Sequence, residues 1–228
     1  KGSVLAYVST VLKEAGYKVG RYISPTIFSY RERIQVNESY ISREDLIRLT
    51  EKVKAAGDQL LAEGRQHPTM FEMETAIAFL YFAEQNCDLV VLEVGMGGRL
   101  DATNVIRNTK VAVLASISMD HMGFLGNTLG EIAEHKAGII KSGCTVVSAS
   151  QQPEAAVSVR KKAEQEGCEL ICVEPEKIKI EKRGLEGQIF SYKEHAQVEI
   201  ALAGEYQFLN GALALEVLDE LKRKGYEI

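Results

Sequence analysis

Residues 88–104, D-L-V-V-L-E-V-G-M-G-G-R-L-D-A-T-N, carry the most information about the fold class. Asp88 to Val94 form a mostly apolar run of strand length, and a glycine-rich loop follows to Asn104. Such runs are typical of strands buried on both faces of a parallel sheet. A carboxylate at the end of such a strand lies where open α/β sheets bind ligands. Glu93 is therefore a candidate ligand of a Mg²⁺ ion that is bound to a nucleotide. The alternative is a structural glutamate that ends the strand before a flexible turn.

Helical and strand patterns alternate on both sides of this stretch. The spacing of apolar residues predicts helices over about 4–14, 42–63, 69–85, 129–139, 153–167 and 208–224, and strands over 17–23, 111–117, 144–149 and 169–173. This alternation predicts an α/β fold with a mostly parallel sheet flanked by helices. Residues 27–37 fit neither pattern. Short alternating stretches from about 176 to 203 predict a small antiparallel β appendage, within a single domain that spans residues 1–228.

The composition excludes several classes of protein. The chain has 228 residues, of which 46% are hydrophobic and 26% charged, with a formal net charge of −5. This excludes a disordered protein, and no apolar run is long enough to predict a membrane span. The mild acidity argues against a nucleic-acid partner. Four cysteines without a C-x-x-C spacing predict neither a disulfide framework nor a zinc site, so we expect a reduced, cytoplasmic protein.

The beginning of the chain resembles the end of a phosphate-binding loop. Lys1, Gly2 and Ser3 run directly into an apolar helical stretch without an initiator methionine or a signal sequence. Helix N-terminal amides, a lysine for the β- and γ-phosphates and a hydroxyl for Mg²⁺ are the parts of such a loop. The preceding glycines of the motif are not in the sequence, so these three residues taken alone favour an accidental K-G-S.

Further polar residues follow the glycine-rich loop and the strand predicted over 111–117. Ser118, Met119, Asp120 and His121 come after that strand, on the same side of the predicted sheet as Glu93. A histidine there is either a metal ligand or a structural residue. The polar groups of residues 100–104 either bind a substrate or form Asx turns. Composition alone leaves Lys136 as a solvated helical lysine.

Taken together, these motifs resemble one known family. In order, the chain carries K-G-S (1–3), S-P (24–25), E-R-I (32–34), T-M-F-E-M-E-T (69–75), E-V-G-M-G-G-R-L-D-A-T-N (93–104), S-M-D-H (118–121), L-G-N-T-L-G-E-I-A-E-H-K-A-G-I-I-K (125–141) and L-A-G-E-Y-Q-F-L-N (202–210). This order resembles the ATPase domain of the folylpolyglutamate synthase/dihydrofolate synthase family, within the Mur ligase superfamily. The resemblance implies a P-loop NTPase-like central domain.

The activity that the resemblance implies is an ATP-dependent ligation. A folate or dihydropteroate carboxylate attacks the γ-phosphate of ATP, and the amine of L-glutamate then displaces phosphate from the acyl phosphate. The partners implied are therefore these small molecules together with Mg²⁺. We expect a monomer that has neither a nucleic-acid nor a membrane partner. The glutamate-binding domain that follows in the family lies beyond Ile228, so we expect the isolated chain to be a poor catalyst.

The resemblance also assigns roles to individual residues. Catalytic roles fall to Lys1, to His121 and to Lys136, which matches a lysine that is carbamylated in the superfamily. Nucleotide binding falls to Lys1, Gly2, Ser3, Gln207 and Asn210. The metal ligands or their supports are Ser3, Ser24, Glu93, His121 and Lys136, and the pterin pocket takes Thr69, Phe71, Asp101 and Ala102. Carbamylation would place an anion beside a second Mg²⁺.

Three positions depart from the family pattern, at Thr26, His135 and Tyr206, where the family usually has His, Glu and His. They bear on substrate and adenine contacts. Two other functions use the same ATPase residues: a Mur-type ligase for a cell-wall or storage-peptide precursor, and a nucleotide-binding module without catalysis. The L-D-A-T-N and T-M-F-E segments favour folate over the peptide precursor.

Overall fold

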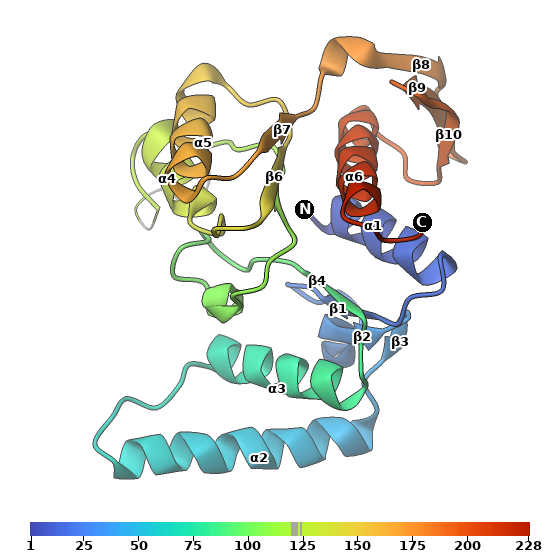
Figure 1. The fold of residues 1–228 in the computed structure, drawn as a ribbon. Helices are drawn as coiled ribbons and strands as arrows, with labels where there is room; N and C mark the ends of the chain where they lie inside the picture. Colours follow the sequence, from blue (N-terminus) through green and yellow to red (C-terminus); the bar gives the residue numbers. More distant parts are fainter. Residues whose placement is uncertain (120–122, 124) are drawn as a thin grey trace. The chain divides into compact units, whose positions relative to one another are not determined.

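A computed structural model describes residues 1–119, 123 and 125–228 of the chain (Figure 1). The chain forms two compact units. The first unit comprises Lys1–Val8, Gly97–Leu100 and Ile106–Ile228, and the second comprises Ser9–Met96 and Asp101–Val105. Helix α1 (Gly2–Glu14) contributes its beginning to the first unit and its end to the second. We describe each unit by itself.

The second unit contains a mixed four-stranded sheet. Its strands are β1 (Val19–Tyr22), β2 (Ile34–Val36), β3 (Ser39–Tyr40) and β4 (Leu89–Leu92), in the order β3-β2-β1-β4. Strands β1 and β4 are parallel, whereas β2 is antiparallel to both β1 and β3. Short 3-10 helices, η1 (Tyr30–Arg33) and η2 (Ala102–Val105), lie in two of the loops. Residues 27–37, which fit neither pattern in the sequence, thus hold η1 and the first antiparallel strand.

The two helices of this unit begin where the sequence predicts. Helices α2 (Arg43–Ala62) and α3 (Met70–Glu84) follow Ser42 and Thr69, whose hydroxyls each accept a hydrogen bond from the backbone amide three residues later. These bonds satisfy amides that have no partner inside the helix. Residues of α2 and α3 pack with Tyr22 of β1 and with Ile34 and Val36 of β2 in one buried cluster, which includes Leu49 at 0% exposure.

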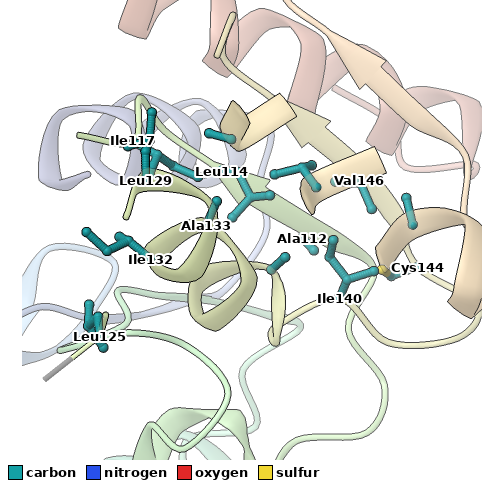
Figure 2. Packing of buried hydrophobic residues seen from close by; sticks show 14 residues of the cluster. Ala112, Leu114, Ile117, Leu125, Leu129, Ile132, Ala133, Ile140, Cys144 and Val146 are labelled. Carbon is teal, nitrogen blue, oxygen red and sulfur yellow. The ribbon is translucent and has the colours of Figure 1, made fainter. Parts of the chain in front are cut away.

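The first unit contains a parallel three-stranded sheet with helices on both faces. The strands β5 (Val111–Leu114), β6 (Thr145–Ser148) and β7 (Leu170–Cys172) are ordered β5-β6-β7. On one face, helices α4 (Leu129–Ala137) and α5 (Pro153–Glu166) enclose an apolar cluster that contains Ile132 and Val146 (Figure 2). On the other, Thr145 donates a hydrogen bond to Glu220 of α6 (Tyr206–Arg223).

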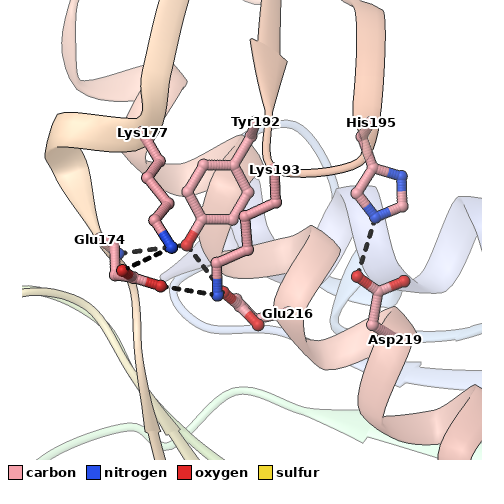
Figure 3. Close-up of polar contacts among 7 residues, drawn as sticks. All are labelled: Glu174, Lys177, Tyr192, Lys193, His195, Glu216 and Asp219. Carbon is pink, nitrogen blue, oxygen red and sulfur yellow. Dashed lines mark hydrogen bonds and ion pairs between the residues drawn. The ribbon is translucent and has the colours of Figure 1, made fainter.

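A small antiparallel sheet is attached to α6. It is formed by β8 (Ile178–Lys182), β9 (Gln188–Tyr192) and β10 (His195–Ile200), and the 3-10 helix η3 (Pro175–Lys177) precedes it. The Tyr192 hydroxyl donates to the buried Glu216 carboxylate at 2.7 Å, and Lys193 Nζ lies 2.6 Å from the same group (Figure 3). His195 Nε2 lies 2.8 Å from Asp219 (Figure 3). Burial is the main reason that the pKa of Tyr192 is raised, to about 12.

The predicted fold class is confirmed, with one difference in the sheets. Helices flank a parallel sheet, and the antiparallel appendage lies within the predicted range. Strands β4 and β5 belong to different hydrogen-bonded sheets, although we expected one sheet to hold both. The single-domain boundary of 1–228 stays a prediction. In the part of the chain that the structure describes, no helix has the length and apolarity needed to cross a membrane.

Candidate functional site

Three of the predicted nucleotide residues of the first unit meet in a network around a buried glutamine. Gln207, in the first turn of α6, is 4% exposed. Its Nε2 donates to the Ser3 hydroxyl at 3.2 Å, and its Oε1 accepts hydrogen bonds from Asn210 Nδ2 at 3.1 Å and from the Tyr7 hydroxyl at 3.2 Å. Three residues predicted from opposite ends of the chain thus share one network.

Tyr7 is a member of this network that the sequence analysis missed. It stands four residues after Ser3 on α1, so both side chains lie on the same face of the helix. Its spacing from Ser3 was the available signal. Burial, followed by the nearby Tyr206, raises the pKa of the Tyr7 hydroxyl further above neutral pH. The protonated hydroxyl donates to Gln207 Oε1.

Lys1 and Gly2 lie at the N-terminus of α1. Gly2 is the first helical residue, and the amide of Leu5 donates to the Lys1 carbonyl at 3.1 Å. No acidic residue occupies the first turn. The first amides of a helix and its dipole favour an anion at this end. This part of the chain is therefore suited to a phosphate group.

A second group of the first unit joins the glycine-rich loop to the end of α4, which carries Lys136. The Arg99 amide donates to the His135 carbonyl at 2.9 Å. A Cβ at Gly98 would lie 2.7 Å from the carbonyl oxygens of both His135 and Lys136, so the loop can approach the helix only with glycine here. A Cβ at Gly138 would likewise lie 2.6 Å from the Arg99 Cα. Lys136 is half-buried.

In the second unit, two predicted metal residues follow neighbouring parallel strands. Tyr22 of β1 is the register partner of Leu92 of β4, and the Glu93 amide donates to the Tyr22 carbonyl at 2.9 Å. Ser24 comes two residues after β1, before a cis peptide bond to Pro25. The carboxyl ends of parallel strands meet at one sheet edge, so Ser24 and Glu93 leave the same edge.

The predicted pterin residues of the second unit lie at the start of α3 and in the glycine-rich loop. A Cβ at Gly95 would lie 2.7 Å from the Phe71 ring and 3.2 Å from the Asp101 carboxylate, so these two side chains converge on Gly95. Thr69 is the N-cap of α3, and Ala102 begins η2. These four predicted residues therefore belong to two short, adjoining segments.

Asp101 forms the Asx turn that the sequence allowed as an alternative. One carboxylate oxygen accepts from the Met96 amide at 3.0 Å. The other accepts from the amide of Thr103 at 3.0 Å and from its hydroxyl at 2.6 Å. The carboxylate therefore fixes the loop, and any contact with a substrate comes in addition to this role.

A charged cluster near Ser24 was not predicted as functional. Arg33 Nη1 lies 2.6 Å from Glu74, which is 6% exposed and also accepts from the Tyr30 hydroxyl at 2.7 Å. The Arg33 carbonyl accepts from the Ile23 amide, directly before Ser24. Burial, followed by the bond to Glu74, raises the pKa of Tyr30. The E-R-I motif contains Arg33, but only the fold brings Glu74 to it.

Glu32 shapes the loop that follows Ser24. Its carboxylate accepts hydrogen bonds from the backbone amides of Ile27, Phe28 and Ser29. These bonds, that of Ile27 first, lower the pKa of Glu32. Ile27 and Phe28 are 81% and 92% exposed, so a buried carboxylate fixes a loop whose apolar side chains face solvent. Large exposed apolar side chains on a fixed loop are suited to contact with an apolar ligand.

His121 lies outside the described residues. Among the residues that are described, no group of three or more His, Cys, Asp or Glu side chains is arranged to hold a metal ion. The predicted site residues therefore form two sets, one in each unit. Lys1, Gly2, Ser3, Lys136, Gln207 and Asn210 belong to the first unit, and Ser24, Thr69, Phe71, Glu93, Asp101 and Ala102 belong to the second.

Known proteins resemble this chain over its whole length. A dihydrofolate synthase/folylpolyglutamate synthase of Bacillus subtilis is 39% identical over 231 residues, which are 99% of this chain and 54% of the relative. A dihydrofolate synthetase of Saccharomyces cerevisiae is 36% identical over 97% of the chain and 51% of its own length. The chain thus spans about half the length of the curated relatives it matches.

The solved structures that are similar to this chain come from the same group of enzymes as these relatives. The apo form of L. casei FPGS has a TM-score of 0.90 at 33% identity, over 98% of this chain and 56% of that one. A structure described as an FPGS–AMPPCP–folate complex has a TM-score of 0.89 at 34% identity, again over 98% and 56%. The Mur ligase middle domain family matches residues 39–218, most of the chain. With these residues matched and this fold, the chain belongs to the Mur ligase middle domain family.

Proposed function

We propose that this chain is the ATP-binding part of a ligase that joins L-glutamate to the carboxylate of a folate or of dihydropteroate. The single observation that carries the proposal is the network around Gln207, because it unites Ser3, at the predicted phosphate end of α1, with Asn210 on α6. The relatives named above are dihydrofolate and folylpolyglutamate synthases, and the similar structure of a complex with AMPPCP and folate supports both substrate classes.

The proposed reaction has two steps. The carboxylate of the pteroyl substrate attacks the γ-phosphorus of ATP, which forms an acyl phosphate and releases ADP. The amine of L-glutamate then attacks the acyl carbon, which forms the amide and releases inorganic phosphate and a proton. Such a reaction needs positioned substrates and neutralised phosphate charge more than it needs a covalent protein intermediate.

The first unit supplies the proposed nucleotide contacts. Lys1 would neutralise the β- and γ-phosphates, while the Gly2 and Ser3 amides at the start of α1 would bind their oxygens. Gln207 would hold Ser3 in place and, with Asn210, would contact the base and ribose. In the second unit, Thr69, Phe71, Asp101 and Ala102 would line the pterin pocket.

The oxygen donors present are suited to Mg²⁺. Ser24 and Glu93 leave the carboxyl ends of the adjacent parallel strands β1 and β4, and Mg²⁺ prefers a few carboxylate or hydroxyl oxygens together with phosphate oxygens. In the second unit, Ser24 and Glu93 are the residues that would hold it, and the family resemblance adds Ser3, His121 and Lys136. When bound, Mg²⁺ would neutralise charge on the nucleotide phosphates.

Lys136 would be carbamylated. Carbamylation joins CO₂ to the side-chain amine and replaces a cation by an anion, which would suit a second Mg²⁺. The close fit of Gly98 against the end of α4 would keep this half-buried lysine in a fixed position. The proposed enzyme acts as a cytoplasmic monomer, without a nucleic-acid or membrane partner.

The experiment is a two-substrate assay of the protein at its full encoded length. Phosphate release from ATP is measured with L-glutamate and either dihydropteroate or tetrahydrofolate. Release that needs both glutamate and a pteroyl substrate supports the proposal. Release that instead needs a cell-wall or storage-peptide precursor assigns the other ligase class, and nucleotide binding without any release assigns a binding module. Either of these results overturns the folate assignment.

A further inference from the structure

Two thiols lie close together at one end of the parallel sheet of the first unit. The sulfur atoms of Cys144 and Cys168 are 3.8 Å apart, and both cysteines are free. Cys144 directly precedes β6, and Cys168 comes two residues before β7. The proposed function uses neither residue. Of the two remaining cysteines, Cys87 lies in the second unit, and Cys172 is the last residue of β7.

The strand register explains why the two sulfurs meet. Val146 of β6 is the register partner of Leu170 of β7, and Cys144 and Cys168 stand two residues before these partners, just outside the two strands. Side chains two residues apart point to the same face of a sheet. Neighbouring strands are about 4.8 Å apart. That spacing lies within the range of about 4.4–6.8 Å between Cα atoms that a disulfide requires.

The surroundings give the two thiols different access to solvent. Cys144 is 4% exposed and belongs to the apolar cluster that also contains Ala112 and Ile140 (Figure 2). Cys168 packs at the edge of this cluster and is only partly buried. Its sulfur donates a hydrogen bond to the Lys141 carbonyl at 3.2 Å, and the Cys144 amide donates to the same oxygen at 3.1 Å.

We propose that Cys144 and Cys168 form a site of reversible oxidative modification, which takes a peroxide as its co-reactant and yields a disulfide. Two thiols and one hydrogen peroxide give one disulfide and two waters. The Cys168 sulfur first attacks the peroxide O–O bond, which forms a sulfenic acid and releases one water. The Cys144 sulfur then attacks the sulfenic sulfur, which forms the S–S bond and releases the hydroxyl oxygen as the second water.

The order of the two steps follows from burial. Cys168 is the less buried of the two cysteines, so we assign it the first reaction with peroxide. Burial raises the pKa of the Cys144 thiol, which keeps it protonated and slow toward peroxide in solution. Once Cys168 carries the sulfenic acid, Cys144 needs only a short approach from its present 3.8 Å.

Oxidation would also change the turn between α4 and β6. In the reduced state, the Lys141 carbonyl accepts from both Cys144 and Cys168. Formation of the disulfide removes the thiol hydrogen of Cys168 and leaves the carbonyl with the Cys144 amide. The turn follows the helix that carries Lys136, so a change there is local to the end of α4.

The test uses the folded chain with Cys87 and Cys172 both replaced by serine, which leaves only the proposed pair. The protein is treated with hydrogen peroxide, and the free thiols are counted by mass spectrometry after alkylation. We expect both thiols to escape alkylation together, and the oxidised protein to weigh about 2 Da less than the untreated, unalkylated protein because two hydrogens are lost. Dithiothreitol should restore both thiols, and a non-reducing peptide map should join the Cys144 and Cys168 peptides.

Two single variants in this background identify the first thiol. In Cys144→Ser we expect no disulfide, and a sulfenic acid on Cys168 that dimedone traps. In Cys168→Ser we expect Cys144 to keep its thiol under the same treatment. The proposal is overturned if each thiol gains oxygen independently without an S–S link, or if peroxide leaves both thiols intact in the folded protein. Circular dichroism verifies that each variant is folded. If Cys144→Ser does not fold, Cys144→Ala is used in its place.

Discussion

Gln207 donates a hydrogen bond from its side-chain amide to the Ser3 hydroxyl, 3.2 Å away and 204 positions earlier in the chain. The bond connects the first turn of α6 to the first turn of α1 within one compact unit. A buried amide holds its partners in fixed directions because an unsatisfied buried donor or acceptor costs free energy. Gln207 therefore sets the position of a hydroxyl that we assign to the nucleotide site.

Replacement of Gln207 by methionine should destabilise the chain and weaken nucleotide binding. The substitution keeps the side-chain volume but removes the acceptor for Tyr7 and Asn210 and the donor for Ser3. We expect a loss of about 1–3 kcal/mol in the free energy of unfolding, measured by urea titration. Affinity for AMPPCP, measured by calorimetry on the full-length protein, should fall as well.

Gln59→Met is the matched control, because Gln59 is exposed on α2 and contacts only Glu63 through its side-chain amide among the bonds described. Its unfolding free energy should change by less than about 0.5 kcal/mol. Equal effects of the two substitutions would show that the loss at Gln207 does not come from its buried network.

Gly98→Ala should be strongly destabilising. The added Cβ would lie 2.7 Å from the carbonyl oxygens of His135 and Lys136, and both are backbone atoms that cannot move alone. We expect a loss of about 1–3 kcal/mol by thermal or chemical unfolding. The control is Gly130→Ala in α4, the helix that carries His135 and Lys136. The added Cβ would contact only the Glu154 side chain, and alanine is more favourable than glycine within a helix. A neutral Gly98→Ala would contradict the close fit of loop and helix.

Glu216→Met should loosen the β appendage. It leaves the Tyr192 hydroxyl without its acceptor and removes one of the two carboxylates beside Lys193 (Figure 3). We expect about 2 kcal/mol of destabilisation, together with faster hydrogen exchange in residues 188–200.

Asp219→Asn on the same helix removes the partner of His195, in a pair whose side chains are 26% and 42% exposed. Exposed ion pairs contribute about 0–1 kcal/mol, so this variant should remain close to wild type. A larger loss of unfolding free energy for Asp219→Asn than for Glu216→Met would contradict our assignment of Glu216 as the residue that holds the β appendage to α6.

The contribution of Glu32 to stability should depend on pH in one direction. Hydrogen bonds from the backbone amides, that of Ile27 first, lower the pKa of Glu32 in the folded chain. A carboxyl group with a lowered folded pKa stabilises the fold above its unfolded pKa of about 4.3, and this contribution is lost as the pH falls through the folded pKa. The melting temperatures of wild type and Glu32→Gln should therefore differ most above about pH 5 and converge below it.

The control for this series is Glu51→Gln on the exposed face of α2. The difference between its melting temperature and that of wild type should stay small at every pH. If the melting temperatures of wild type and Glu32→Gln differ by the same amount at pH 7 and pH 3, the charge of the Glu32 carboxylate does not fix the loop.

Local patterns predicted most of the elements because their causes are local. Ser42 and Thr69 marked two helix starts, since an N-cap hydroxyl acts within its own turn. The apolar runs at 88–94 and 144–149 both gave strands. Strand β6 is buried throughout, as such a run predicts, whereas β4 is an edge strand that is only partly buried, with Val90 40% exposed. The short strand β2 escaped prediction because its partners β1 and β3, rather than its own pattern, hold it in place.

The parts of the site that escaped prediction depend on contacts distant in sequence. Glu74 stands 41 residues from Arg33, and no local pattern connects them. No local pattern connects Cys144 with Cys168, since only the register of β6 and β7 aligns them. Ser3, Gln207 and Asn210 were assigned through the family resemblance, and their contact in the first unit is a property of the fold.

The most direct test of the proposed function follows labelled L-glutamate in the full-length protein with ATP and a pteroyl acceptor. We predict that glutamate is incorporated into the pteroyl product with one phosphate released per amide bond. Incorporation should fail when ATP is replaced by AMPPCP, whose β–γ bridge cannot be cleaved. No incorporation with dihydropteroate or with any reduced folate, by a folded protein that binds ATP, would contradict the assignment of this chain to a folate ligase.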